Sequence, residues 1–358
     1  MTTLDPPYGP FDPGGMAARM DDIPEQIEDA LARDAAAPWR LPAGSPRMLA
    51  VGAMGGSAIA ADLTAGLYAD RMPHPLIVVR DYHWPAWVTR DALALLCSYS
   101  GNTEETLGLY REAASRLIPR VALTAGGALA LACERDDVPY ASVPAGSPPR
   151  AALFSAWVPI TRLVHALGWC DDPVPDWGAA ATRLREVRSR IGTAAPEERN
   201  PAKQLAHALL GRHVLVYCGT ERMTAVASRM RQQLNENAKV LGHSATVPEL
   251  NHNEIVGWER PDAFHRNSTV LILRDAEDAP EVTARLDLTA EYARCQGAAV
   301  HVIESCEGGR LTRLAAHVMF ADYLSLYLAF LRGVDPTPIA SIDQFKRRLS
   351  EAGAKRES

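Results

Sequence analysis

The sequence lacks an apolar run long enough to cross a membrane. Its apolar runs, such as Ala92–Cys97 and Val270–Leu273, are far shorter than the ~20 residues that span a bilayer. The residues from Leu4 to Gly15 are rich in Pro, Gly and Asp rather than basic and then apolar, so we expect no signal peptide. An excess of positive charge is also missing, because 37 basic and 43 acidic side chains leave a net charge of −6. We therefore expect neither a membrane nor a nucleic acid as a partner.

The patterns that hold disulfides and metals are missing too. The six cysteines are scattered without a C-x-x-C pair, which is typical of reduced thiols in a cytoplasmic protein. The ten histidines form no H-x-H or H-E-x-x-H group, so we expect no metal and no cofactor. What remains is a chain of 358 residues, 47% hydrophobic and 22% charged, which indicates a folded globular protein of about two domains.

Apolar runs alternate with helix-like stretches from Met48 onward, which predicts an α/β fold with parallel sheets. In the first half we expect strands at 48–51, 76–79, 92–98, 120–124 and 139–143, and helices at 23–35, 58–68, 103–117, 128–135 and 151–167. The second half repeats the pattern, with strands at 213–218, 269–274 and 298–304 and a helix at 223–241. We predict two tandem doubly wound, flavodoxin-like domains, with the following order along the chain: a flexible tail at 1–20, a first domain at 21–170, a proline-rich linker at 171–200 and a second domain at 201–358.

A hydroxyl-rich turn follows the third predicted strand. Ser98, Ser100 and Thr103 lie where that strand leads into a helix, and free N–H groups at a helix N-terminus attract anions. The turn has no Lys or Arg, so it would suit a phosphate held mainly by neutral donors. The alternative is an ordinary helix cap, because Asn102 and Glu105 have the spacing of a capping pattern.

A glycine-rich turn with Gly55, Gly56 and Ser57 follows the first strand. It matches neither G-x-G-x-x-G nor a P-loop. Ligands of open α/β sheets bind beyond the carboxyl ends of strands, where both turns would meet. The matching strand end of the second half, residues 274–278, is acidic, so we expect an anion only in the first half.

Five motifs together resemble the bifunctional phosphoglucose/phosphomannose isomerases, which carry two sugar isomerase (SIS) domains. They are Gly-Gly-Ser at 55–57, S-x-S-G-N-T at 98–103, Pro-Arg at 149–150, L-N-E-N-A-K at 234–239 and N-H-N-E at 251–254. The resemblance implies two SIS domains with parallel sheets and an aldose–ketose isomerase that interconverts glucose and mannose 6-phosphates with fructose 6-phosphate through a cis-enediol. It also implies that the glycine-rich turn, Ser98, Ser100 and Thr103 hold the phosphate of a hexose 6-phosphate substrate, in a homodimer whose sites lie near the subunit interface.

The same resemblance assigns the catalytic roles. Glu236 would move the proton between C1 and C2, His252 and Lys346 would open and close the ring, and Arg150 would steady the enediolate. Whether His252 serves its own or the neighbouring subunit's site stays open. Each residue has a plainer alternative: a solvated carboxylate for Glu236, an exposed loop histidine for His252, and surface cations for Arg150 and Lys346.

The position of Glu236 on its predicted helix favours a role outside the core. Met230, Leu234, Ala238 and Leu241 would form an apolar stripe, and Glu236 lies about 200° from Leu234 among amide side chains. A carboxylate among amides in a cleft suits a base.

Two other functions remain as alternatives. A phosphosugar-sensing protein would keep the hydroxyl-rich turn but would need no base. An amidotransferase-like sugar synthase would need a glutaminase domain with an N-terminal cysteine, whereas this chain starts Met-Thr-Thr.

Overall fold

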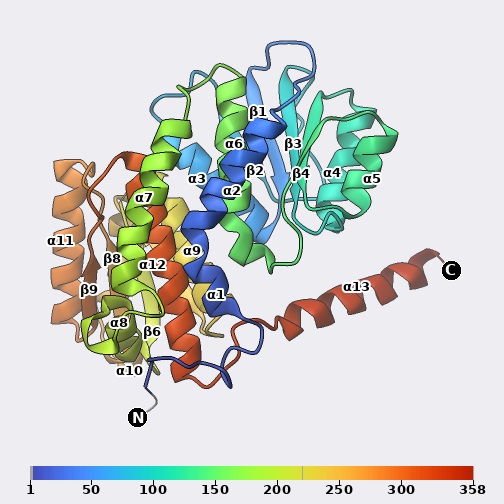
Figure 1. Ribbon diagram of the computed structural model, residues 1–358. Helices are drawn as coiled ribbons and strands as arrows, with labels where there is room; N and C mark the ends of the chain where they lie inside the picture. Colours follow the sequence, from blue (N-terminus) through green and yellow to red (C-terminus); the bar gives the residue numbers. More distant parts are fainter. Residues whose placement is uncertain (1–2, 220, 358) are drawn as a thin grey trace.

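The computed structural model of the protein describes residues 3–219 and 221–357. Its frame is a pair of parallel sheets (Figure 1). The first sheet has the order β2-β1-β3-β4-β5, with strands β1 Met48–Ala53, β2 Leu76–Val79, β3 Ala92–Ser98, β4 Arg120–Thr124 and β5 Tyr140–Ser142. The second sheet has the order β7-β6-β8-β9, with strands β6 His213–Cys218, β7 Gly242–Thr246, β8 Ser268–Leu273 and β9 Ala299–Ile303.

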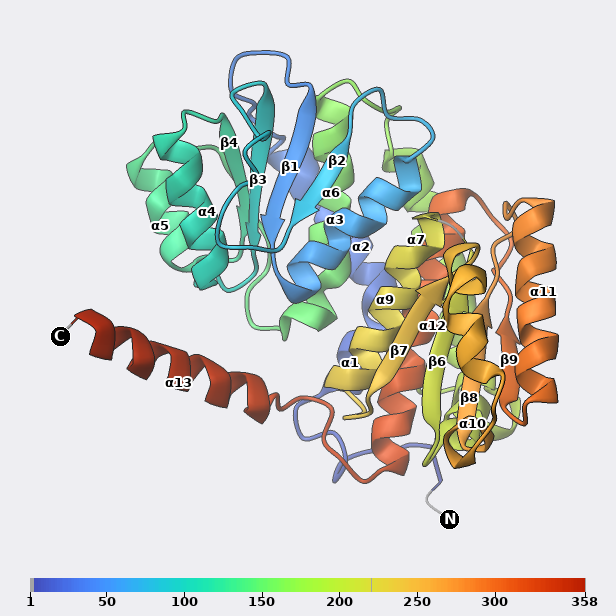
Figure 2. The same cartoon turned by 180° about the vertical axis from the view of Figure 1, so that it is seen from behind.

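Helices cover both faces of each sheet, as Figures 1 and 2 show from opposite sides. The α-helices are α1 Met16–Asp21, α2 Ile23–Ala36, α3 Gly55–Tyr68, α4 Glu104–Ser115, α5 Gly127–Arg135, α6 Leu153–Ala166, α7 Val174–Ile191, α8 Pro201–Leu209, α9 Glu221–Glu236, α10 Ala263–Arg266, α11 Pro280–Cys295, α12 Arg310–Leu331 and α13 Ala340–Glu357. Four short 3-10 helices are η1 Pro149–Ala152, η2 Glu197–Arg199, η3 Glu249–His252 and η4 Glu254–Trp258.

The largest core lies between the two sheets. It joins apolar side chains of α2, α3 and α6 from the first half with those of α7, α9 and α12. Smaller clusters fill the outer faces, beneath α4 and α5 on the first sheet and beneath α11 on the second. Strands buried on both faces explain the near-continuous apolar runs of the sequence.

The predicted internal repeat is confirmed. The order β2-β1-β3-β4 of the first sheet has the same topology as β7-β6-β8-β9 of the second, and every pairing is parallel. The sequence pattern does not predict strand β7, because Gly242 to Thr246 contains no continuous apolar run. The unit α5–β5 has no counterpart after β9, where the chain enters α12 directly.

Two segments are more ordered than the sequence predicts. In the stretch expected as a linker, α7 buries Trp177 and Leu184, and the Trp177 indole donates a hydrogen bond to Thr161 Oγ1 at 2.8 Å. In the stretch expected as a flexible tail, Leu4 and Met16 are fully buried. Their apolar side chains fill gaps in the central core, which the local Pro and Gly content does not reveal. The domain boundaries stay a prediction.

Among the described residues, α12 is long and apolar enough to cross a membrane by length and composition alone. The sequence analysis did not single it out, because Arg313, His317 and Asp322 interrupt its apolar residues. Within the protein, 89% of its most apolar window is buried. It lies in the middle of the structure between the two sheets (Figure 1).

Candidate active site

The hydroxyl-rich turn lies at the carboxyl end of β3 and leads into α4. Ser98 is buried, and its Oγ lies 2.8 Å from Thr103 Oγ1. Thr103 occupies the N-cap position of α4 without a side-chain cap hydrogen bond. Asn102, the capping candidate, instead accepts a hydrogen bond from the Ala128 N–H at 3.0 Å. The first turn of α4 therefore keeps N–H groups that no side chain caps, as an anion site requires.

The glycine-rich turn lies beside it. The Tyr99 N–H donates to Ser57 Oγ at 3.3 Å, which joins the end of β3 to the start of α3. The N-cap of α3, Met54, makes no side-chain cap hydrogen bond either. Gly56 approaches the backbone of Pro149, where an added Cβ would lie 3.4 Å from the carbonyl carbon. The two turns thus adjoin each other and the start of η1.

Gly101 fixes the shape of the hydroxyl-rich turn. Its φ is +68°, and an added Cβ would lie 1.7 Å from the Gly126 carbonyl oxygen. The Gly101 carbonyl also accepts from the Leu129 N–H at 2.9 Å. The turn is therefore seated directly on the start of α5.

We expect Gly101→Ala to lower the free energy of unfolding by about 3 kcal/mol, about 1–2 from the left-handed backbone and the rest from the clash. Gly168→Ala is the matched control, because Gly168 has φ +73° with open space around it. Chemical denaturation of both variants separates strain from clash. Equal losses in the two would mean that the turn is not held against Gly126.

Arg150 and Glu236 meet at the junction of the two halves. Arg150, from η1, is 2% exposed, and its Nη1 lies 3.5 Å from Glu236 Oε2. The Arg150 Nε donates to Asn237 Oδ1 at 2.7 Å, and its Nη2 donates to the carbonyls of Pro336 and Thr337 at 2.7 and 2.9 Å. Burial lowers the pKa of the Arg150 guanidinium, an effect that neighbouring Glu236 opposes. Glu236 stays partly open, with 28% of its side chain exposed.

The helix that carries Glu236 ends sooner than predicted. The periodicity predicts a helix to residue 241, but α9 ends at Glu236. Lys239 takes the left-handed position with φ +55°, and the Val240 N–H donates to the Leu234 carbonyl at 3.0 Å. Leu241 is consequently 90% exposed and leaves the predicted apolar stripe. Glu236 therefore sits on the last turn of a helix, facing Arg150.

A buried polar network lies behind this pair. Asp322 Oδ1, on α12, accepts from Arg229 Nη2 at 2.8 Å and from the Gln233 amide at 2.7 Å. Arg229 Nη2 also donates to the Arg150 carbonyl at 2.6 Å. Asn237, fully buried, donates to Ser325 Oγ at 3.0 Å. The network fixes both the backbone and the guanidinium of Arg150.

Lys239 and Asn237 are site residues whose roles the sequence analysis did not identify. The Lys239 ammonium donates to the carbonyls of Glu236 and Pro338, and burial together with nearby Arg150 lowers its pKa. Both residues belong to the L-N-E-N-A-K motif, and this membership is the only sequence signal that could have marked them as site residues. Only the fold shows that the carbonyls of Pro336 and Pro338, a hundred residues later, are partners of Lys239, and that Arg150 and Ser325 are partners of Asn237.

His252 does not join Glu236 within one chain. Leu250 and Trp258, on either side of it, pack with α11 on the outer face of the second sheet. Leu234 of α9 packs on the inner face. The sheet therefore separates the exposed His252 from Glu236 of the same chain.

Lys346 also lies outside the cluster. It is an exposed residue of α13, which extends away from the rest of the chain (Figures 1 and 2). The plainer alternative for Lys346, a solvated surface cation, fits its exposed position in the single chain.

The corresponding strand end of the second half is filled by ion pairs. Arg313 Nε lies 2.8 Å from Asp275 Oδ2, and Arg313 Nη2 lies 2.6 Å from Glu277 Oε1. The guanidinium holds the pKa of Asp275 below its usual range, against the opposing effect of burial. Paired carboxylates therefore stand where the first half has hydroxyls. The single anion site stays a prediction.

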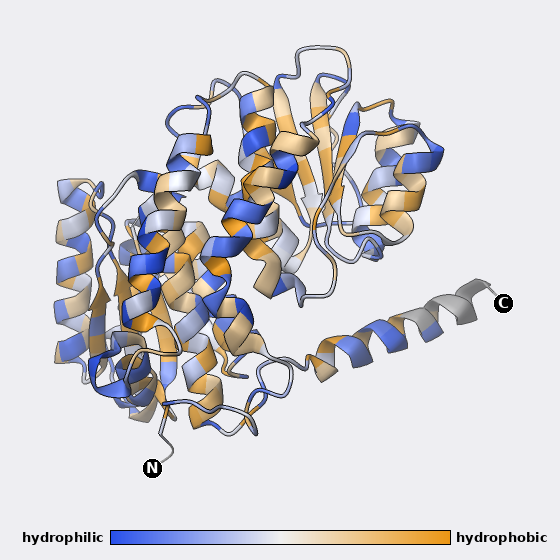
Figure 3. Ribbon diagram, in the orientation of Figure 1, coloured by the Kyte–Doolittle hydropathy of each residue, from blue (hydrophilic) through white to orange (hydrophobic). Residues whose placement is uncertain are grey.

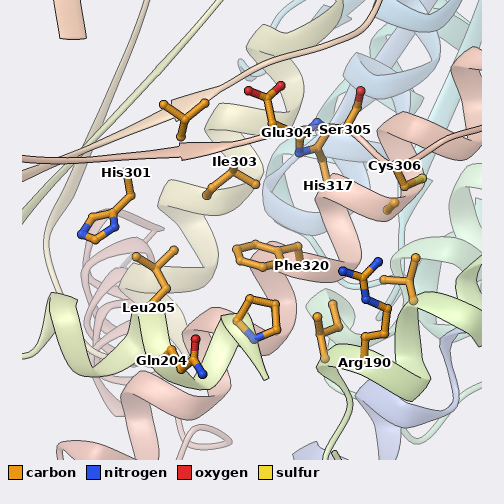
Figure 4. Close-up of a pocket in the computed structure, with 15 residues that line it drawn as sticks. Arg190, Gln204, Leu205, His301, Ile303, Glu304, Ser305, Cys306, His317 and Phe320 are labelled. Carbon is orange, nitrogen blue, oxygen red and sulfur yellow. The ribbon is translucent and has the colours of Figure 1, made fainter. Parts of the chain in front are cut away.

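A cavity of about 610 Å³ lies between α7, α8, β9 and α12 (Figure 4). Leu205, His317 and Phe320 line it, and none of the predicted site residues does. Within residues 3–219 and 221–357, no group of three or more His, Cys, Asp or Glu side chains could hold a metal ion.

Comparisons with known proteins identify the family to which this chain is related. Residues 198–349 match the family model of the bacterial phospho-glucose isomerase C-terminal SIS domain. Bifunctional phosphoglucose/phosphomannose isomerases from Caldicellulosiruptor bescii and Aquifex aeolicus are 35% and 31% identical, covering 92% and 83% of this chain and 97% and 89% of those proteins. A solved glucose-6-phosphate isomerase like protein from Thermus thermophilus shares the fold, with a TM-score of 0.62, 21% identity and coverage of 97% of this chain and 99% of that chain. The chain therefore belongs to the bifunctional phosphoglucose/phosphomannose isomerase family.

Proposed function

We propose that this chain interconverts glucose 6-phosphate and mannose 6-phosphate with fructose 6-phosphate. The observation that carries the proposal is the Arg150–Glu236 pair. Arg150 lies in η1, and η1 contacts Gly56 at the start of α3. The N-termini of α3 and α4, which no side chain caps, therefore lie next to the pair. A carboxylate and a fixed cation beside an anion site are the groups that an enediolate reaction needs.

The reaction begins with the phosphate bound by Ser57, Ser98, Ser100 and Thr103 at the starts of α3 and α4. Glu236 removes the C2 proton of the open-chain aldose and returns it to C1. The C1 oxygen gains a proton and the C2 hydroxyl loses one, so that C2 becomes the carbonyl of the ketose. Arg150 stabilises the negative charge that develops on the enediolate. Both C2 epimers give the same enediol if the C2–C3 bond rotates in the site, so one base serves two substrates.

The enzyme in this proposal is a cytoplasmic homodimer in which the neighbouring subunit supplies His252. The support is that the second sheet separates His252 from Glu236 within one chain. An imidazole that passes protons near neutral pH suits ring opening. Lys346 would assist His252 in opening and closing the ring.

A coupled assay on glucose, mannose and glucosamine 6-phosphates tests the proposal. We expect turnover of the first two, with fructose 6-phosphate as the product. A pure, folded protein without activity on either would contradict the isomerase function, and binding without turnover would favour a sensing protein.

We expect Ser100→Asp to raise KM at least 10-fold, because a carboxylate in the turn repels the substrate phosphate. Ser115→Asp makes the same change at the other end of α4, about 16 Å away, and should leave KM near wild type. An unchanged KM in Ser100→Asp would show that the phosphate binds elsewhere.

A further inference from the structure

The N-terminal segment lies against the loop that supplies hydrogen-bond acceptors to Arg150. Residues 3–15, which we call the N-terminal strap, pass the C-terminal end of α12 and meet the chain just before α13 (Figure 1). That end of α12 carries hydrophobic residues (Figure 3). The loop after α12 contains Pro336 and Thr337, whose carbonyls accept from Arg150 Nη2 at 2.7 and 2.9 Å. The strap therefore contacts a loop that holds a predicted catalytic cation.

The strap meets this loop at Gly14. A Cβ added at Gly14 would lie 2.1 Å from Thr337 Oγ1, 2.6 Å from Thr337 Cβ and 2.8 Å from Thr337 Cγ2. Thr337 Oγ1 is buried and has no hydrogen-bond partner among the described residues, so packing holds this side chain. Only a glycine leaves room for Thr337 here, and the carbonyl of Thr337 is one of those that bind Arg150.

The start of the strap is anchored by a buried charge. Lys203 is fully buried, and its ammonium donates to Asp5 Oδ1 at 3.1 Å and to the carbonyls of Thr193 and Ala195 at 3.2 and 2.7 Å. Leu4, the residue before Asp5, is fully buried as well. A buried ammonium is costly unless it is paired and hydrogen-bonded, so a strap that moved away would leave Lys203 without its carboxylate.

The middle and the end of the strap are fixed too. The Tyr8 ring stacks on Phe330 of α12, with 4.7 Å between the ring centroids. The Asp12 carboxylate accepts from the first two N–H groups of α1 at 2.6 and 2.8 Å. Gly14 follows these contacts directly and leads into α1, so it cannot retreat from Thr337 without breaking them.

We propose that the N-terminal strap positions Arg150, with Gly14 as the positioning residue that holds the Pro336 and Thr337 carbonyls against the guanidinium. This inference rests on the proposed isomerase function, in which Arg150 stabilises the enediolate. The guanidinium faces Glu236 in a fixed direction only while its acceptors stay in place. A catalytic cation needs such placement, because a shift of about 1 Å can cost about 10²-fold in rate.

The test replaces Gly14 in the full-length protein. Its backbone is outside the left-handed region, so Gly14→Ala adds a methyl group without backbone strain. The methyl group displaces Thr337 and its carbonyl, and we expect kcat to fall about 10-fold or more. KM for glucose 6-phosphate should change little, because the phosphate turns are untouched. Gly9→Ala is the matched control in the same strap: nothing lies within 4 Å of a Cβ at Gly9, so both constants should stay near wild type.

A second substitution tests the route through Thr337. The three atoms nearest to the added methyl group all belong to the Thr337 side chain, and Thr337→Gly removes them. We expect Gly14→Ala to lower kcat about 10-fold or more in the wild-type background, but by no more than about 2-fold when Thr337→Gly is already present. A general loss of stability would not be cancelled in this way. An equal loss of kcat in both backgrounds would overturn the proposal.

The wild type distinguishes a failure of this inference from a failure of the proposed function. An active wild type with an unchanged kcat in Gly14→Ala would overturn the inference and leave the isomerase function standing. A folded wild type without activity would overturn both. If Gly14→Ala does not fold, Tyr8→Ala loosens the strap on Phe330 without a clash and should also lower kcat with little change in KM. An unchanged kcat in Tyr8→Ala would then contradict the positioning role.

Discussion

Glu236→Gln should lower kcat by about 10²–10⁴-fold or more while KM changes little. The amide keeps the size of the side chain and can still accept a hydrogen bond from Arg150, whose Nη1 lies 3.5 Å away. It cannot accept the C2 proton, however. The phosphate contacts are unchanged, so the lost interaction is one that the transition state alone uses.

The measurement combines steady-state kinetics with solvent deuterium exchange at C2, which should stop together with turnover. The fold should survive, because Glu236 is partly exposed and its replacement opens no cavity. Glu259→Gln, an exposed change of the same kind, serves as the control. A soluble Glu236→Gln enzyme within a few-fold of wild type would show that Glu236 is not the base.

The sequence was most informative where chemistry and local structure depend on the same few residues. Strands buried on both faces give apolar runs, so the two sheets and their repeat could be predicted from local pattern. The hydroxyl-rich turn left two interpretations open, an anion site and a helix cap. The structure excludes Asn102 as the cap, because its side chain binds the Ala128 N–H instead. The anion site stays a prediction.

The sequence was least informative where distant segments set the geometry. The apolar periodicity predicts that the helix of Glu236 continues past its actual end. No local sequence signal indicates that Lys239 adopts a left-handed backbone conformation. Lys239 is held there by Pro338, a contact across a hundred residues. Arg150 follows two prolines and has the pattern of a surface cation, yet the meeting of η1 with α9 buries it. His252 and Lys346 lie apart from the cluster in one chain, so no intrachain pattern could bring them together.

The largest expected loss of stability comes from the buried ion pair behind the site. Arg229 and Asp322 are 1% and 2% exposed, and Asp322 Oδ1 accepts from both the Nε and the Nη2 of Arg229, at 3.1 and 2.8 Å. Asp322→Ala leaves the guanidinium charged, buried and without its carboxylate. We expect the free energy of unfolding to fall by about 3–5 kcal/mol, measured by chemical denaturation.

The same variant should impair catalysis, because Arg229 Nη2 also donates to the Arg150 carbonyl at 2.6 Å. An Arg229 that is no longer held by Asp322 lets η1 shift, and with it the guanidinium that faces Glu236. Since Arg229 lies behind Arg150 and not at the phosphate turns, we expect kcat to fall about 10-fold with KM little changed. A misplacement of about 1 Å is enough for a loss of that size.

A double variant separates the two effects. Arg229→Met with Asp322→Leu removes both charges and fills the space with apolar side chains, so no unpaired charge remains. It should be more stable than Asp322→Ala by at least about 2 kcal/mol, although the Gln233 amide loses its acceptor. Its kcat should nevertheless stay low, because the hydrogen bond to the Arg150 carbonyl is still missing. If stability and kcat recover together in the double variant, the network only stabilises the fold. If neither the single nor the double variant changes kcat, Asn237 and the Pro336 and Thr337 carbonyls are sufficient to hold Arg150 in place.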